Sequence, residues 1–188
     1  MNNIKTIHLI AKYAIFFVAV ISLFIPMVVL SAQQPNLVPN SSFENDTADL
    51  PPADYISYMG NIGVKLTVDG SVGYNGSLQS AKISGATVDA AYVYTIDVLP
   101  GEKYRLESFC KQIGDGTASM QIFWKTGDKW SFYTAMPYSG DGDWKKAVIE
   151  VTIPAAAITT TLTLRLHIEG QTTASSAVWF DNVSIRKL

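Results

Sequence analysis

From residue 36 to the C-terminus, apolar and polar residues alternate with a period of two, the pattern of strands that bury one face. We predict strands over eight runs of this kind: 63–68, 78–83, 91–98, 103–111, 117–125, 145–153, 161–169 and 177–186. Gly, Asn and Asp residues separate the runs, and no part of this region has a convincing helical period. The pattern therefore predicts an all-β fold, a single β-sandwich of the jelly-roll kind over residues 36–188.

The same alternation assigns side chains to faces, because neighbouring residues of a strand point to opposite sides of its sheet. In 161–169 the aliphatic positions must face the core, and they are Leu162, Leu164, Leu166 and Ile168. The outward positions of three strands mix aromatic with charged and polar residues. If 103–111, 117–125 and 161–169 share a sheet, its solvent side carries Arg105, Glu107, Phe109, Gln121, Phe123, Arg165, His167 and Glu169.

Such a face is suited to a sugar, because aromatic rings cover the apolar faces of pyranose rings while polar side chains bond the hydroxyls. We predict sugar contacts from Phe109, Phe123, Gln121, Glu107 and Arg165. The alternative is an ordinary solvated sheet face, on which Thr, Lys, Glu and Arg need no ligand.

A second aromatic group lies in a loop or short strand after 117–125 and includes Trp130 and Tyr133. Loop aromatics at the end of a sandwich can border a binding groove or cover an edge of the core. We take Trp130 and Tyr133 as candidates for the rim of the groove, and the second interpretation stays open.

An apolar leader precedes the β region. Basic residues come before an apolar run over 13–30, and small residues ending at Ala32 follow it, as in a secretory signal. We expect cleavage after Ala32, which makes 1–32 a signal peptide. The alternative is an uncleaved anchor, because 9–30 is long enough to span a bilayer. Both interpretations export the β region, so the protein is expected to be secreted or to face outside on a membrane anchor.

Charge narrows the choice of partners. The 188 residues include 14 Lys or Arg and 16 Asp or Glu, and none of the acidic residues lies in the leader. The region after the leader is therefore mildly acidic and has no Lys/Arg cluster. Nucleic acid is excluded as the main partner, and a membrane is expected only if the leader is retained, because anionic partners need dense positive charge.

Cysteine usage adds one constraint. Cys110 is the single cysteine, so the chain cannot form an internal disulfide. A thiol nucleophile needs an activating base, and after the leader only His167 is available for this role. We therefore predict that Cys110 is a small buried core residue.

Three segments carry a resemblance to a known family. They are NLVPNSSFE at 36–44, LPGEKYRLESF at 99–109 and VWFDNVSI at 178–185. In their order and spacing they resemble the bacterial carbohydrate-binding modules of families 4, 9 and 22. The resemblance implies a jelly roll that binds a polysaccharide, such as a plant cell-wall β-glycan, on its concave sheet face without catalysis. Xylan, β-glucan, cellulose and mannan are all compatible with it.

The resemblance also implies a structural calcium ion where the first and last strands of the module meet. Its carboxylate ligands in this chain would be Glu44 and Asp181. Calcium takes six to eight oxygen ligands, so carbonyls, amides or water would complete the set, some of them from the loops that hold Asn45, Asp46 and Asn61. The alternative is that Glu44 and Asp181 only cap strand ends by hydrogen bonding.

Two other functions remain open, because a fold does not decide a function. A small jelly-roll glycoside hydrolase needs two carboxyls beside one bond, and Glu107 with Glu169 is the candidate pair. A polysaccharide lyase needs a base and a cation, for which His167 beside Arg165 is the candidate. An extracellular structural or adhesion domain without sugar binding is the remaining alternative.

Overall fold

The structure is a computed structural model that describes residues 33–126, 129–138, 142–155 and 161–188, with residues 126 and 129–136 described by their backbone alone. The expected signal peptide, its cleavage site and the alternative anchor lie outside these residues. In the described part of the chain, no helix is long and apolar enough to cross a membrane.

Within the unit of residues 34–188, the described residues form ten strands. They are β1 (Ile56–Met59), β2 (Lys65–Asp69), β3 (Ser80–Ser84), β4 (Asp89–Asp97), β5 (Lys103–Ile113), β6 (Thr117–Thr126), β7 (Lys129–Pro137), β8 (Lys145–Thr152), β9 (Thr161–Glu169) and β10 (Ala177–Lys187). Eight of them correspond to the predicted runs, and β9 has the predicted bounds.

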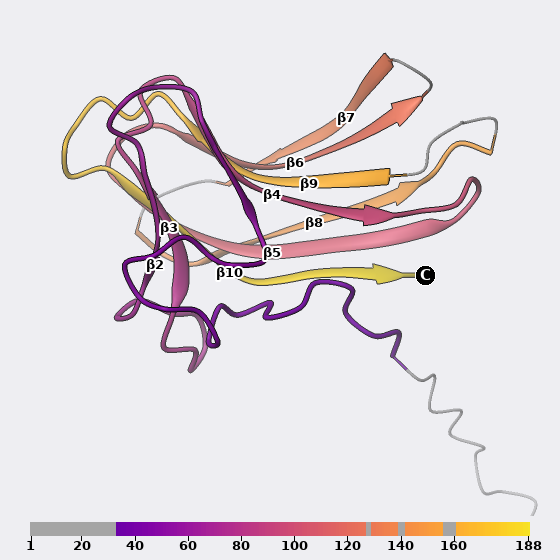
Figure 1. Ribbon diagram of the computed structural model, residues 1–188, viewed down its shortest axis with the longest axis horizontal. Coiled ribbons are helices and arrows are strands. Elements are labelled where there is room, and N and C mark those ends of the chain that lie inside the picture. Colours follow the sequence, from indigo (N-terminus) through magenta and orange to yellow (C-terminus); the bar gives the residue numbers. More distant parts are fainter. Residues whose placement is uncertain (1–32, 127–128, 139–141, 156–160) are drawn as a thin grey trace, which may run out of the picture. The chain divides into compact units, whose positions relative to one another are not determined.

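The strands divide into two five-stranded antiparallel sheets. Sheet A has the order β1-β4-β9-β6-β7, and sheet B has the order β2-β3-β10-β5-β8. Figure 1 shows β7, β6, β9 and β4 in one layer and β8, β5 and β10 in the other. The two layers make a β-sandwich, so the predicted all-β jelly-roll class is confirmed.

The expectation that 103–111 shares a sheet with 117–125 and 161–169 is wrong. Strand β5 pairs with β8 and β10 in sheet B, whereas β6 and β9 pair with each other in sheet A. The turn between β5 and β6 therefore carries the chain from one layer to the other. Period-two alternation identifies the buried face of a strand but not the strand beside it.

The inner faces of both sheets form one core. The aliphatic residues predicted to point inward from β9, Leu162, Leu164, Leu166 and Ile168, have no exposed surface. Cys110 on β5 is 1% exposed, which confirms it as a core residue. Tyr138 bridges the layers: it follows β7 of sheet A and bonds through its hydroxyl to Ser108 on β5 of sheet B.

Candidate functional site

The outward face of sheet A presents its side chains in cross-strand rows. Arg165 on β9 lies opposite Val93 on β4 and Gln121 on β6. The row on one side has His167 between Ala91 and Ser119, and the row on the other side has Thr163 between Thr95 and Phe123. Strand β1 extends these rows at the edge, where Tyr58 pairs with Ala91. Side chains from four strands thus meet on one face.

At the centre of this face, Arg165 lies between two aromatic rings. Its guanidinium carbon is 5.0 Å from the centre of the Tyr58 ring and 5.5 Å from that of Phe123, within the range of cation–π attraction. These three residues, with Val93 and Thr163, line a hollow of about 420 Å³. We call this hollow the sheet A groove.

An ion pair holds Arg165 in this position. Its Nη2 lies 3.0 Å from Asp89 Oδ1 and 3.1 Å from Asp89 Oδ2, and its Nη1 lies 3.4 Å from the amide oxygen of Gln121. A planar guanidinium that is bonded on one edge and faced by rings has little freedom to rotate. The groove is therefore organised before any ligand binds.

His167 extends the network away from the groove. Its Nε2 lies 2.7 Å from Asp89 Oδ1, and its Nδ1 lies 3.0 Å from Ser119 Oγ and 2.9 Å from Gln121 Nε2. Burial lowers the pKa of His167, and nearby Arg165 lowers it further, while Asp89 opposes both effects. Both ring nitrogens thus have partners inside the protein, and His167 and Arg165, the candidate pair for a lyase, belong to one network around Asp89.

The floor of this face is well covered although it lies on the outer side of the sandwich. His167 and Ser119 are each 5% exposed, and Thr163 is 8% exposed. Tyr58, by contrast, is 47% exposed at the edge strand. A covered polar floor beside an exposed ring is the usual arrangement of a site that orients a ligand by a few polar groups.

The structure divides the predicted sugar contacts between the two sheets. Gln121, Phe123 and Arg165 come together on sheet A, as the sequence predicts. Glu107 and Phe109 lie on β5 and therefore belong to sheet B, together with the weaker candidate Arg105. One continuous face cannot include all of them.

On sheet B, both predicted contacts already have protein partners. The Phe109 ring stacks on Tyr74 with their centres 3.8 Å apart and their planes at 18°. Glu107 accepts from Arg105 Nε at 2.7 Å and pairs with Lys146 Nζ at 3.0 Å. Burial acts to raise the pKa of Glu107, but these cations lower it overall. This face has the salt-bridged character of an ordinary sheet surface.

Trp130 and Tyr133 lie on strand β7. Of the two placements that the sequence left open, a loop or a strand, the strand is correct. Trp130 pairs with Lys125 of β6, at the edge of sheet A. The pairing passes from Thr134 to Phe132 across a register shift, which leaves Tyr133 at a β-bulge. The side chains of both residues lie outside the described part, and their role at a rim stays a prediction.

Sequence reasoning missed two residues of the groove network. Tyr58 lies in the four-residue β1, which is too short for its alternation to stand out. Asp89 precedes the predicted run 91–98, although it has the same parity as Ala91 and Val93. Extending that run by two residues would have placed Asp89 on the outward face.

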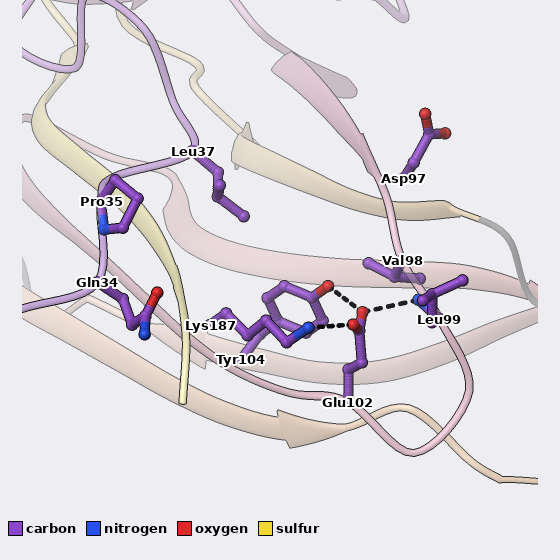
Figure 2. A pocket seen from close by; sticks show the side chains of 9 residues that line it. All are labelled: Gln34, Pro35, Leu37, Asp97, Val98, Leu99, Glu102, Tyr104 and Lys187. Atoms are coloured by element: carbon purple, nitrogen blue, oxygen red, sulfur yellow. Dashed lines mark hydrogen bonds and ion pairs between the residues drawn. The ribbon is translucent and has the colours of Figure 1, made fainter.

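A second hollow, of about 360 Å³, lies where the N-terminal segment of the module meets the β4–β5 connection and the end of β10. Figure 2 shows that Glu102 is its central polar group, with Tyr104, Lys187 and the backbone of Leu99 as partners. These bonds lower the pKa of Glu102 to about 2. The carboxylate is thus already satisfied, and Asp97 points away from it (Figure 2).

The two carboxylates of the expected calcium site lie close to the same serine. Ser77 Oγ is 2.6 Å from Glu44 Oε1 and 2.8 Å from the carbonyl oxygen of Gln79, and it also bonds Asp181. The carbonyl oxygen of Ser42 lies 3.5 Å from the same hydroxyl. Glu44 Oε1 also accepts from the backbone N–H groups of Leu78 and Gln79, each at 2.9 Å. One hydroxyl donates a single proton, so the Ser77 hydroxyl cannot satisfy all the oxygen acceptors around it.

This donor set fits a calcium ion, which prefers carboxylate, hydroxyl and carbonyl oxygens. Asp181 is fully buried and accepts from the backbone N–H groups of Tyr74 and Asn182, and burial raises its pKa to about 6. No group of three or more His, Cys, Asp or Glu side chains gathers among the residues described. Carbonyl, hydroxyl or water oxygens would therefore have to complete the coordination. The amide of Asn61, one of the residues expected beside the ion, bonds the backbone of Gly85 and Val88.

The backbone around these carboxylates is unusual. Asn40, Phe43, Asn75 and Asn182 all have positive φ, at 43°, 63°, 49° and 47°. Asn adopts this region at little cost, but a bulky aromatic residue does so rarely. Phe43 is fully buried directly before Glu44, so packing fixes the backbone from which the Glu44 side chain extends. Residues in such conformations gather at functional sites.

Two antiparallel sheets with a hollow on one outward face define a β-sandwich of the ligand-binding jelly-roll class. The sequence model of a family described as "Carbohydrate binding domain", covering families 4 and 9, matches residues 35–176. The chain belongs to this family of carbohydrate-binding domains. No curated protein matches the chain closely enough to add to this assignment.

Solved structures show the same fold at low sequence identity. The CBM22-1 xylan-binding domain of Paenibacillus barcinonensis Xyn10C is 19% identical, with a TM-score of 0.58 over 82% of this chain and 96% of that one. A cyclase from Fischerella sp. TAU is 19% identical, with a TM-score of 0.62 over 83% and 96%. The enzymatically active domain of tailspike protein 4 of bacteriophage CBA120 is 15% identical, with a TM-score of 0.61 over 81% of this chain but only 21% of that one. Enzymes as well as binding modules thus share the architecture.

The fold separates the carboxyls of the candidate hydrolase pair. Glu107 lies on β5 of sheet B and Glu169 on β9 of sheet A, and each points outward. A glycoside hydrolase needs its two carboxyls to flank one bond. The proposed catalytic pair is therefore wrong, because the two side chains lie on opposite faces of the sandwich.

Proposed function

We propose that the chain binds a polysaccharide, without catalysis, in the sheet A groove. The observation that supports this most directly is the position of Arg165 between Tyr58 and Phe123, which places two ring surfaces beside a fixed guanidinium. Membership of a family of carbohydrate-binding domains supports the ligand class. A plant cell-wall β-glycan is the polysaccharide that we propose.

Each part of the groove has a distinct task in this proposal. Tyr58 and Phe123 present flat apolar surfaces on which sugar rings stack. Arg165 donates to ring and hydroxyl oxygens, because a guanidinium bonded on one side keeps N–H groups free on the other. Gln121 helps to hold Arg165 through its amide oxygen, while its amide nitrogen bonds Ser119 and His167. Thr163 borders the hollow with a small polar group. No group here needs to change protonation state, as expected for binding alone.

The test is affinity electrophoresis of the purified chain through gels that contain arabinoxylan, mixed-linkage β-glucan, mannan or galactan. We expect one neutral glycan to retard the protein, and Tyr58→Ala and Phe123→Ala each to weaken binding by about tenfold or more. Phe109→Ala on sheet B is the matched aromatic control and should retain binding. A parallel assay for new reducing ends should remain negative. Retardation lost in Phe109→Ala but not in Phe123→Ala would contradict the choice of face.

We also propose that Glu44 and Asp181 hold a structural calcium ion with Ser77 and nearby carbonyl oxygens. The ion would supply the positive charge that the converging oxygens lack, and would tie the opening segment of the module to β10 and to the loop between β2 and β3. Its expected role is stability, because neither carboxylate lies on the sheet A groove.

Thermal unfolding with and without calcium tests this site. Calcium should raise Tm after treatment with EDTA, and Glu44→Gln should abolish most of the increase. Glu169→Gln, on an exposed carboxylate of β9, is the matched control and should respond as the wild type does. An equal calcium response in the Glu44 variant would contradict the proposal.

We propose finally that the chain is exported, with 1–32 removed as a signal peptide. N-terminal sequencing of the protein recovered from an exporting host should find a start at Gln33. Recovery of the uncut chain in the membrane fraction would instead support the retained anchor.

A further inference from the structure

The groove combines one fixed positive charge with one fixed negative charge. Among the described residues that line the hollow, Arg165 alone is charged, and its side chain is 19% exposed. Asp89 contacts it through both carboxylate oxygens and is itself 27% exposed. Asp89 does not itself line the hollow, but a ligand that bonds the Arg165 guanidinium binds a cation whose charge this carboxylate already neutralises.

The register of sheet A explains why Asp89 can reach Arg165. Arg165 pairs with Val93, and Asp89 lies two outward positions away from Val93 on β4. The outward position between them is Ala91, whose methyl group leaves room for the two longer side chains to meet. His167, which pairs with Ala91, also bonds Asp89 Oδ1, at 2.7 Å. Two neighbouring side chains thus hold the Asp89 carboxylate against Arg165.

A carboxylate ligand would compete with Asp89 for this arginine. Guanidinium groups bind carboxylates edge-on through paired N–H bonds, and Asp89 already occupies Nη2. Glu169, which pairs with Asp89 across β4 and β9, adds a second acidic side chain to the same end of the face. A carboxylate on a ligand would be attracted by an Arg165 charge that Asp89 already neutralises in part, and it would be repelled by Asp89 and Glu169. Such like-charge contacts suppress the binding of wrong partners.

We propose that Asp89 determines the charge class of the ligand: by neutralising Arg165, it excludes uronate-bearing glycans from a groove that would otherwise accept them. The inference rests on the proposed function of the same groove. Asp89 acts here through Arg165, so it is a positioning residue that also sets specificity. A purely structural Asp89 would affect all ligands alike.

The experiment compares the purified wild-type chain with Asp89→Asn, Asp89→Glu and the double variant Asp89→Asn/Arg165→Gln. The neutral probes are arabinoxylan, β-glucan, mannan and galactan, and the acidic probes are polygalacturonate and alginate. We expect Asp89→Asn to raise the ratio of acidic to neutral affinity by about tenfold or more, with the acidic binding weakening as salt increases. Asp89→Glu should restore the wild-type ratio, and the double variant should lose the gain.

Asp97→Asn is the matched control, because Asp97 lies on the same strand at the far end from Asp89, beside the other hollow. It should leave the ratio unchanged. The proposal is overturned if the wild type binds a neutral glycan but Asp89→Asn does not raise the ratio, or if wild type and variant bind polygalacturonate equally. If no variant binds any neutral or acidic probe, the proposed function itself fails, and the role of Asp89 fails with it.

Discussion

At the scale of single residues, the titration of His167 reports the network behind the groove. Burial and Arg165 lower its pKa, and Asp89 opposes them. We therefore expect the NMR titration midpoint of this imidazole to lie below the usual value of about 6.5. Asp89→Asn should lower the midpoint further, and Arg165→Gln should raise it.

The only other histidine of the chain is His8 in the leader, so the signals are simple to assign. A midpoint that neither substitution moves would mean that His167 is not coupled to the ion pair in solution.

Asp181 is the second residue whose titration can be tested. Burial raises its pKa to about 6. An unfolded Asp titrates near 4, so between these values the metal-free folded state binds more protons than the unfolded state. The proton on Asp181 therefore stabilises the metal-free fold by at most about 3 kcal/mol below about pH 4. This stabilisation is lost as the pH rises through 6. Calcium binds the ionised carboxylate, so the rise in Tm that it causes should grow from pH 4 to 7.

Melting curves in EDTA and in millimolar calcium across this range measure the effect. Asp181→Asn, which cannot titrate, should give a calcium response that is small at every pH. A response of the wild type that stays constant from pH 4 to 7 would contradict the assignment to Asp181.

At the scale of elements, the sequence predicts what depends on a single strand and misses what depends on strand pairing. The alternation in 161–169 correctly assigns Leu164 to the core and Arg165 to the surface, because the side-chain period is a local property. Whether Phe109 and Phe123 share a face depends on which layer each strand joins. The alternation makes both rings candidate sugar contacts, yet Tyr74, from a loop distant in the sequence, stacks on Phe109. The sequence alone does not show that these two rings meet.

The loop between β2 and β3 has no room for a side chain at Gly73. A Cβ on Gly73 would lie 2.1 Å from the backbone oxygen of Ser77, which no side-chain movement can relieve. Gly73→Ala should therefore displace Ser77 and cost about 1–3 kcal/mol of unfolding free energy, as overpacking does. It should also weaken the calcium response, because Ser77 contacts Glu44.

Gly70→Ala in the same loop is the control, because its Cβ would only approach the Cβ of Ala48 at 3.1 Å. Urea unfolding of both variants makes the comparison. Equal stability of the two would show that the turn at Gly73 relaxes without cost.

At the scale of the whole molecule, the two outer faces of the sandwich have different characters. On sheet A, the ionic network leaves ring surfaces beside a hollow, whereas on sheet B ion pairs and a ring stack satisfy one another. The core between them is continuous, and the Tyr138 hydroxyl links the layers through Ser108. Binding on sheet A therefore needs no movement of one layer against the other.

A continuous core predicts that residues 34–188 unfold as one cooperative unit, and Cys110 provides the probe. It is the single cysteine of the chain, it points into the core from β5, and burial raises the pKa of its thiol. A thiol reagent should leave the folded protein unlabelled at neutral pH, because reaction needs an exposed thiolate. Across a urea series, brief labelling should rise with the same midpoint as tryptophan fluorescence, as two-state unfolding requires. Labelling at lower urea than the fluorescence change would instead show that the core around β5 opens before the molecule unfolds as a whole, and that the two layers are not one cooperative unit.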